Sequence, residues 1–318
     1  MAQRLAIAAA RAGSAGIVLA DEPTKGLDLA RSDEVAGHLC HVTETGGALL
    51  TITHDLELAE ALGGEIVVLR EGRVVECGTA ARVLSAPAAD YTMDLIAAEP
   101  RHWPMRNRAA PGAEVLRAEG LAVGRGRRIL ASSLDLTFRA GEVVGLAGPS
   151  GVGKSSLGDT LLGLIAPAAG RVTRAAGLGP LRFQKLWQDP PAAFAPRLAL
   201  ADLMARHRIA PDRLPPLMER LRLDPALLDR RPGEVSGGEL QRLSIARALL
   251  LDPVFLFADE PTSRLDPLTQ RELIALLTGL ARDRNVALLL VSHQPDLIGK
   301  AADRVIRLDL PADGMAAA

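Results

Sequence analysis

The chain reads Gly148-Pro149-Ser150-Gly151-Val152-Gly153-Lys154-Ser155 near its middle. The apolar run 142–147 before it predicts a short buried strand, and the residues from Ser156 to 162 predict the start of a helix. A glycine-rich turn between strand and helix points several backbone N–H groups into one concavity, at the positive end of the helix dipole. Lys154 adds a cation for the β- and γ-phosphates, and Ser155 a hydroxyl for Mg²⁺. We therefore expect a nucleoside triphosphate site here, and not merely a glycine-rich turn that holds a lysine.

Two carboxylates end an apolar run further along the chain. Residues 249–260 predict a strand that finishes with Asp259 and Glu260. Neighbouring side chains on a strand point to opposite faces, so the two acids can have different roles. Asp259 suits the Mg²⁺ shell, and Glu260 suits a general base that polarises the attacking water. The alternative is that both acids simply end a strand in solvent.

Two further polar residues follow predicted strands. His293 comes after the apolar run 286–292, and we expect it to contact the γ-phosphate and align water, Glu260 and nucleotide. Gln188 ends a predicted strand and can reach both metal and water, which makes it a candidate sensor of the γ-phosphate. An ordinary polar loop residue is the alternative for His293.

A second glycine-containing turn opens an amphipathic helix. Ser236 is placed as its N-cap, and Gly237 and Gly238 let backbone N–H groups approach an anion closely. An ordinary capped helix is the alternative. If the turn Ser236-Gly237-Gly238 binds phosphate, we expect it to bind the nucleotide of a partner. A helical insert separates this turn from residues 148–155 of its own domain.

The chain contains part of itself twice. Residues Ala20-Asp21-Glu22-Pro23-Thr24 recur as Ala258-Asp259-Glu260-Pro261-Thr262, and Thr53-His54 correspond to Ser292-His293. At this offset Met1 aligns with Glu239, so the first copy lacks its front half. We expect a partial domain over residues 1–98, a linker over 99–113, a complete domain over 114–310 and a tail over 311–318. Either Met1 is an internal methionine of a longer protein, which we favour, or the gene is a decayed remnant.

Composition narrows the class of protein. The formal net charge of −1 gives no bulk attraction to nucleic acid or to an anionic membrane. No apolar run approaches the roughly 20 residues that span a bilayer, and the N-terminus carries no leader pattern. We expect a cytoplasmic protein that meets a membrane only through a partner, with an α/β fold and a mostly parallel sheet.

These motifs together carry a family resemblance. The second copy resembles an ATP-binding-cassette (ABC) ATPase domain, with Walker A at 148–155, a glutamine loop at Gln188, the signature VSGGELQR at 235–242, Walker B at 254–260, a D-loop at Ser263-Arg264-Leu265-Asp266 and the switch His293. The resemblance implies a P-loop NTPase fold with an antiparallel β subdomain and a helical insert. It also implies ATP and Mg²⁺ as cofactors, ATP hydrolysis, and Asp266 in the nucleotide site.

The resemblance can be narrowed further. Trp187-Gln188-Asp189-Pro190 with Pro196-Arg197, and the stretch 87–100, are similar to the ATPases of oligopeptide, dipeptide and nickel importers. Such ATPases imply two permease subunits in the inner or plasma membrane, an extracytoplasmic solute-binding protein, and a second cassette that completes two ATP sites. A peripheral location on the cytoplasmic membrane face follows, with no nucleic acid partner. A non-transport ABC ATPase and a nucleotide-binding remnant without turnover are the alternatives.

The sequence departs from the family pattern in two places. No aromatic residue precedes Walker A to stack on adenine, so Arg125 or Arg127 would have to take that role. The first copy lacks a Walker A and a signature serine, so neither composite site is expected to close within this chain. Loss of a strand from a parallel sheet should also expose apolar edges and leave residues 1–98 unstable alone.

Overall fold

A computed structural model describes residues 16–27, 29–106, 110, 112–126, 128–205, 211–263 and 265–309. The predictions for Met1, Arg127, Arg264 and the tail lie outside these residues. The chain divides between Pro104 and Met105 into two compact units, with residues 266–272 grouped with the first. The predicted domain boundaries otherwise stay a prediction.

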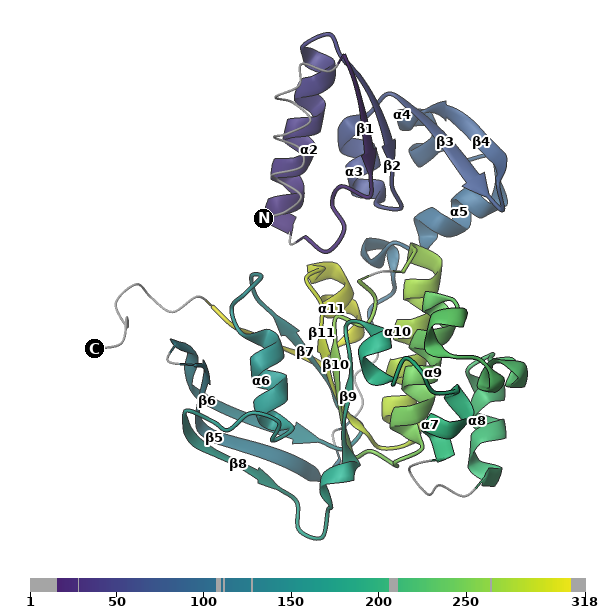
Figure 1. Cartoon of the computed structure of the whole chain (residues 1–318). Helices are drawn as coiled ribbons and strands as arrows, with labels where there is room; N and C mark the ends of the chain where they lie inside the picture. The colour runs from purple at the N-terminus through teal and green to yellow at the C-terminus, as the bar shows by residue number, and fades with distance from the viewer. Residues whose placement is uncertain are drawn as a thin grey trace. The chain divides into compact units, whose positions relative to one another are not determined.

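A five-stranded parallel sheet forms the centre of the second unit. Its strand order is β12-β7-β11-β10-β9 (Figure 1). The strands are β7 (Val143–Ala147), β9 (Phe183–Leu186), β10 (Phe255–Asp259), β11 (Ala287–Val291) and β12 (Arg304–Arg307). Every residue of β9, β10 and β11 is buried, as expected of a parallel sheet covered on both faces. The predicted mostly parallel α/β fold is confirmed.

The predicted strand over 249–260 was too long. Helix α9 (Gly237–Leu249) continues into its first residue, Asp252 has a left-handed φ of 47°, and β10 begins only at Phe255. The error has a physical cause, because a continuous apolar run does not distinguish the end of a buried helix from a buried strand.

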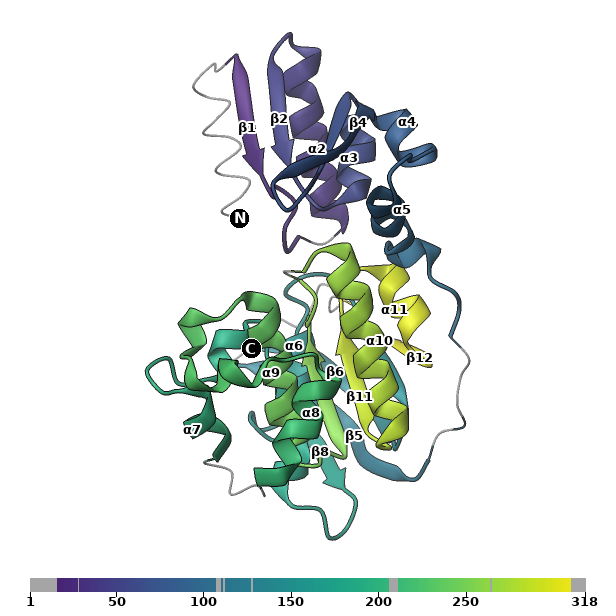
Figure 2. The same cartoon turned by 90° about the vertical axis from the view of Figure 1, so that its right-hand side faces the viewer.

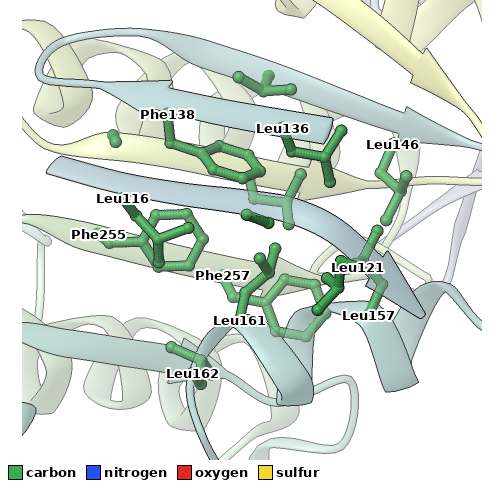
Figure 3. Packing of buried hydrophobic residues seen from close by; sticks show 14 of the residues in the cluster. Leu116, Leu121, Leu136, Phe138, Leu146, Leu157, Leu161, Leu162, Phe255 and Phe257 are labelled. Carbon is green, nitrogen blue, oxygen red and sulfur yellow. The ribbon is translucent and has the colours of Figure 1, made fainter. Parts of the chain in front are cut away.

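An antiparallel sheet and one helix cover the first face of the parallel sheet. The antiparallel order is β6-β5-β8, with β5 (Glu114–Arg125), β6 (Arg128–Arg139) and β8 (Ala169–Arg174). Together with α6 (Lys154–Leu161) these strands enclose the largest described hydrophobic cluster, shown in Figure 3. Phe138 of β6 meets Phe255 of β10 edge to face, with ring centroids 5.2 Å apart. The antiparallel subdomain predicted from the resemblance is therefore present.

The other elements of this unit are helical, and Figure 2 shows several of them on the opposite face of the sheet. The α-helices are α7 (Leu200–Ala205), α8 (Leu214–Arg220), α10 (Pro267–Asp283) and α11 (Pro295–Ala301). The 3₁₀ turns are η2 (Pro180–Arg182), η3 (Pro190–Ala193), η4 (Pro211–Arg213), η5 (Pro225–Asp229) and η6 (Pro232–Glu234). Helices α7 and α8 lie between Gln188 and the signature, where the helical insert was expected.

The first unit repeats a smaller part of this plan. Strands β1 (Ile17–Asp21) and β2 (Ala48–Ile52) form a two-stranded parallel sheet, and β3 (Glu65–Arg70) pairs antiparallel with β4 (Arg73–Thr79). The helices are α2 (Leu29–Glu44), α3 (Leu56–Leu62), α4 (Ala80–Ser85) and α5 (Asp90–Ala97), followed by η1 (Pro100–His102). A small core of Val35, Leu39 and Leu58 packs under one face of the β1–β2 sheet.

The other face of the β1–β2 sheet is apolar and exposed. Leu19 is 74% exposed and Leu50 61%. Their counterparts in the repeat, Phe257 and Leu289, are fully buried, because β5, β6 and α6 cover that face in the second unit. The exposed apolar surface is thus one face of this sheet, and the exposed strand edges expected from the sequence stay a prediction.

The first part of the predicted linker is ordered. Residues 100–102 form η1, and the indole of the buried Trp103 donates a hydrogen bond to the carbonyl of Ala98 at 2.8 Å. Burial is the main cause that raises the pKa of Glu99 to about 7, and the nearby Asp55 and Glu57 raise it further while Arg101 opposes them. Residues 99–103 are therefore packed, although their composition, rich in proline and arginine, predicted a linker.

We expect this carboxyl to make stability depend on pH. The pKa of Glu99 in the folded chain, about 7, exceeds its ordinary value of 4.5, so the unfolded chain loses the proton first as pH rises. The free energy of unfolding should fall between about pH 5 and 7 and then level off. Urea titrations at several pH values should show this fall in the parent chain and a flatter profile in Glu99→Gln. Glu71→Gln, in an exposed turn, is the control; equal slopes in all three proteins would contradict the assignment.

Candidate functional site

The phosphate loop depends on glycine at two positions with positive φ. Gly148 has φ 149°, and a Cβ there would collide with the carbonyl oxygen of Leu308. Gly153 has φ 108°, and its Cβ would lie 2.9 Å from the Cβ of Leu130 on β6. Side chains disfavour these backbone conformations, so the loop can take this path only with glycine at both positions.

Lys154 opens helix α6 and folds back over the loop. Its ammonium donates to the carbonyl oxygens of Gly148 at 2.7 Å and Pro149 at 3.0 Å, and its side chain is buried. Gly153 caps the helix without any side-chain hydrogen bond. Backbone N–H groups at such a helix start suit a phosphate, and the lysine lies where it can exchange carbonyls for phosphate oxygens.

Parallel strands bring the other candidate residues to the same edge of the sheet. The loop follows β7, Gln188 comes two residues after β9, Asp259 ends β10, and His293 comes two residues after β11. These four strands are adjacent in the sheet and run parallel, so their carboxyl ends meet. The edge predicted from sequence as the site is therefore formed in the structure.

Asp259 lies beside the hydroxyl of the loop serine. Ser155 Oγ donates to Asp259 Oδ1 at 3.1 Å, and Asp259 is 5% exposed. Burial is the largest influence and raises the pKa of this carboxyl, while Lys185 and the hydrogen bond from Ser155 oppose it. The hydroxyl and the carboxylate thus converge on one point, as a shared Mg²⁺ would require.

Glu260 has different partners from its neighbour. Gln188 Nε2 donates to Glu260 Oε2 at 2.8 Å, and His293 Nδ1 lies 3.6 Å from the same oxygen. The contact with His293 is the first cause that lowers the pKa of Glu260, and Lys154 adds to it, while burial opposes both. Glu260 also has a left-handed φ of 46°, which turns the chain at the end of β10.

Gln188 is thus placed with Glu260 and not with Ser155 and Asp259. The predicted sensing role beside the general base agrees with this contact. This contact uses Nε2 of Gln188 and not Oε1, the atom that would bind Mg²⁺, so the predicted place of Gln188 in the metal shell stays a prediction.

The first unit repeats the pairing of glutamate and histidine. Glu22 also has a φ of 46°, and His54 Nδ1 lies 2.7 Å from Glu22 Oε1. The repeat in sequence therefore extends to side-chain geometry.

The remaining candidate residues do not join this cluster. Ser236 and Glu239 form a capping box at α9, in which Ser236 Oγ accepts from Glu239 N at 3.3 Å and Glu239 Oε2 accepts from Ser236 N at 2.9 Å. Gly237 is exposed. Asp266 caps α10, where it accepts from Thr269 N at 3.1 Å. Arg125 is exposed at the end of β5.

Three residues of this site were missed from the sequence. The buried Lys185 forms an ion pair with the half-buried Asp159 beside Asp259, and Gly158 lets α6 pack against Phe257. A charged residue inside an otherwise buried strand, β9, was the signal for Lys185. Asp159 carried a weaker signal, its spacing of one helical turn from Ser155.

The donors fit a Mg²⁺ ion that is held together with a nucleotide. Among the described residues no cluster of three or more His, Cys, Asp or Glu side chains could hold a metal. Mg²⁺ in phosphate-binding sites takes only one or two protein oxygens and keeps water and phosphate ligands for the rest. The hydroxyl of Ser155 and the carboxylate of Asp259 supply that number.

Comparison with known proteins places this geometry in a family. Residues 131–263 match the family model described as "ABC transporter". The chain contains an ABC transporter ATP-binding domain. The peptidoglycan transport ATP-binding protein YejF of Agrobacterium fabrum is 34% identical over 96% of this chain and 61% of its own length. The glutathione import ATP-binding protein GsiA of Escherichia coli is 31% identical over 96% of this chain and 58% of its own.

The chain thus spans about three fifths of the length of these two relatives. Solved structures agree with the fold. An ATP-binding subunit of an ABC transporter has a TM-score of 0.54 and 26% identity, and it covers 63% of this chain and 89% of that chain. The dimeric cassette MJ0796 has a TM-score of 0.53 at 23% identity, over 61% of this chain and 94% of that one.

No helix among the described residues is long and apolar enough to cross a membrane.

Proposed function

We propose that this chain is an ATP-binding and ATP-hydrolysing subunit of an ABC importer. The observation that carries the proposal is the position of Glu260. Its carboxylate contacts both Gln188 and His293, one residue after Asp259 and at the sheet edge that holds the phosphate loop.

The residues divide the chemistry among them. Lys154 would turn from the carbonyls of Gly148 and Pro149 to the β- and γ-phosphates, and Ser155 with Asp259 would hold Mg²⁺. Mg²⁺, when bound, neutralises charge on the phosphates. Glu260 acts as the general base because of its position beside Gln188 and His293; the lowered pKa of its carboxyl keeps it ionised but weakens it as a proton acceptor. His293 and Gln188 orient that carboxylate.

The solute and the partners are inferred from the named relatives. The relatives described above are named for peptidoglycan and glutathione, so we propose uptake of a peptide-like solute. The sequence also allowed nickel as the transported solute, but neither of these names mentions nickel. Permease subunits in the membrane, an extracytoplasmic binding protein acting indirectly, and a location on the cytoplasmic membrane face belong to this proposal.

A second cassette would complete the site. The turn Ser236-Gly237-Gly238 is exposed at its first two residues, and the hydrogen bonds described for Ser236 go to Glu239 and Leu240 of the same helix. We propose that it closes over the nucleotide of another cassette, with Asp266 nearby, and that the loop at 148–155 receives such a turn in return.

One set of measurements tests the proposal. Calorimetry with ATP and Mg²⁺ should show binding to the purified chain, and phosphate release should appear when a partner cassette and permease are present. Loss of binding in Lys154→Ala, with the fold retained by circular dichroism, would place the nucleotide on this loop. Binding without turnover under every condition would favour the remnant, and turnover without co-purifying membrane subunits would favour a non-transport ATPase.

We also expect weak selection for the base. Arg125 is an exposed arginine and offers a planar guanidinium instead of an aromatic ring, and guanine stacks on that plane as well as adenine. GTP should therefore compete for the site within about tenfold of the affinity of ATP, since a stacking contact is worth about 1 kcal/mol. Competitive binding against labelled ATP would measure this. Arg125→Tyr is the matched variant, and strict preference for ATP in the parent chain would contradict the expectation.

A further inference from the structure

A buried lysine lies beside the carboxylate that would hold Mg²⁺. Lys185 Nζ is 2.6 Å from Asp159 Oδ1 and 3.6 Å from Asp259 Oδ2, and the lysine side chain is only 8% exposed. Asp259 also accepts the hydroxyl of Ser155. The candidate metal ligands and this ion pair therefore form one continuous polar network.

The positions of these residues follow from the sheet and from one helix. Lys185 on β9 is paired in register with Phe257 on β10, and Asp259 lies two residues further along β10, on the same face of the sheet. Ser155 and Asp159 lie one turn apart on α6 and share a face. Gly158 allows this helix to approach the ring of Phe257 closely.

The surroundings favour a retained positive charge. The ammonium of Lys185 lies 4.5 Å from the ring centroid of Trp187 and 5.2 Å from that of Phe257. Aromatic faces attract a cation, and two carboxylates within 4 Å add Coulomb attraction in a buried setting. A lysine placed this way acts as a fixed cation beside the metal position.

We infer that Lys185 is a positioning residue that sets how much Mg²⁺ this nucleotide site requires, with Asp159 holding the ammonium at its distance from Asp259. This rests on the proposed function. The ammonium orients Asp259 while no metal is bound, and it repels a divalent cation that arrives at the same carboxylate. Asp159 limits that repulsion, because it draws the ammonium away from Asp259.

The inference gives opposite effects for two single variants. Lys185→Met keeps the length of the side chain and removes the cation, so the Mg²⁺ concentration for half-maximal ATP binding should fall about tenfold. Asp159→Asn frees the ammonium to approach Asp259, so that concentration should rise by a factor of about three. In the double variant the effect of Asp159→Asn should shrink, because Asp159 acts through Lys185.

The experiment measures ATP binding to the full chain by calorimetry at a series of Mg²⁺ concentrations. Lys300→Met is the control for the loss of one lysine charge, and it should leave the Mg²⁺ requirement unchanged. A purely structural ion pair would lower the denaturation midpoint and leave the Mg²⁺ requirement unchanged in both single variants, and that result overturns the inference. If Lys185→Met does not fold, Asp159→Asn alone decides, since an unchanged or lower Mg²⁺ requirement contradicts it. Absence of ATP binding in the parent chain at saturating Mg²⁺ would instead refute the proposed function.

Discussion

Glu260→Gln is expected to reduce ATP hydrolysis about a thousandfold, within the range that a positioned general base contributes. Glutamine keeps the size of the side chain and can still meet Gln188 and His293, but it cannot accept a proton from water. Affinity for MgATP should change little, because the contacts proposed for the phosphates come from residues 148–155. Steady-state phosphate release and calorimetric ATP binding, measured in the assembled complex, separate the two effects.

The control for this variant is Glu71→Gln, which makes the same chemical change in an exposed turn of the first unit. It should hydrolyse ATP at the parental rate. A Glu260→Gln protein that retains more than about a tenth of parental turnover would remove Glu260 from the role of general base, given the size of such contributions.

Gly158→Ala is expected to destabilise the second unit by about 3 kcal/mol, the upper range for overpacking a core. A Cβ on Gly158 would overlap the ring of Phe257, and even the third-nearest ring atom would be 2.5 Å away. Phe257 is completely buried, so its ring has no free space to enter. Helix α6 would have to move, and with it Lys154 and Ser155. Thermal unfolding should show the loss, and ATP binding should weaken in parallel.

Gly279→Ala in α10 is the matched control, because it makes the same change in a helix where the new Cβ would meet nothing within 4 Å. It should stabilise the chain by up to about 1 kcal/mol through helix propensity. Phe257→Leu should partly rescue Gly158→Ala by removing ring atoms. Equal effects of the two alanine variants would show that the close approach of α6 to β10 does not limit stability.

The principal site was predictable from local patterns because parallel strands bring their carboxyl ends to one edge. The loop at 148–155, Asp259, Glu260 and His293 each follow an apolar run, and the structure gathers them as expected. The internal repeat aligns His54 with His293, and the pairing of Glu22 with His54 repeats in space the pairing of Glu260 with His293. The roles of these residues in catalysis remain proposals.

Other features could not be predicted from a single sequence. The start of β10 was placed too early, since apolar residues fill a buried helix end and a buried strand alike. Glu99 lay in a stretch whose composition favoured a linker, yet it packs near Asp55 and Glu57. Its raised pKa depends on neighbours that are distant in the chain.

The sequence alone determined that this chain holds a phosphate loop, an ordered set of ABC motifs and a partial repeat, because these depend on residue type and spacing. Only the tertiary structure placed Lys185 between Asp159 and Asp259, and Gly158 against Phe257. Those contacts join three elements, α6, β9 and β10, and their distances are set by sheet register and helix packing. Register and packing depend on the whole core, so no local pattern around Lys185 or Gly158 could specify them.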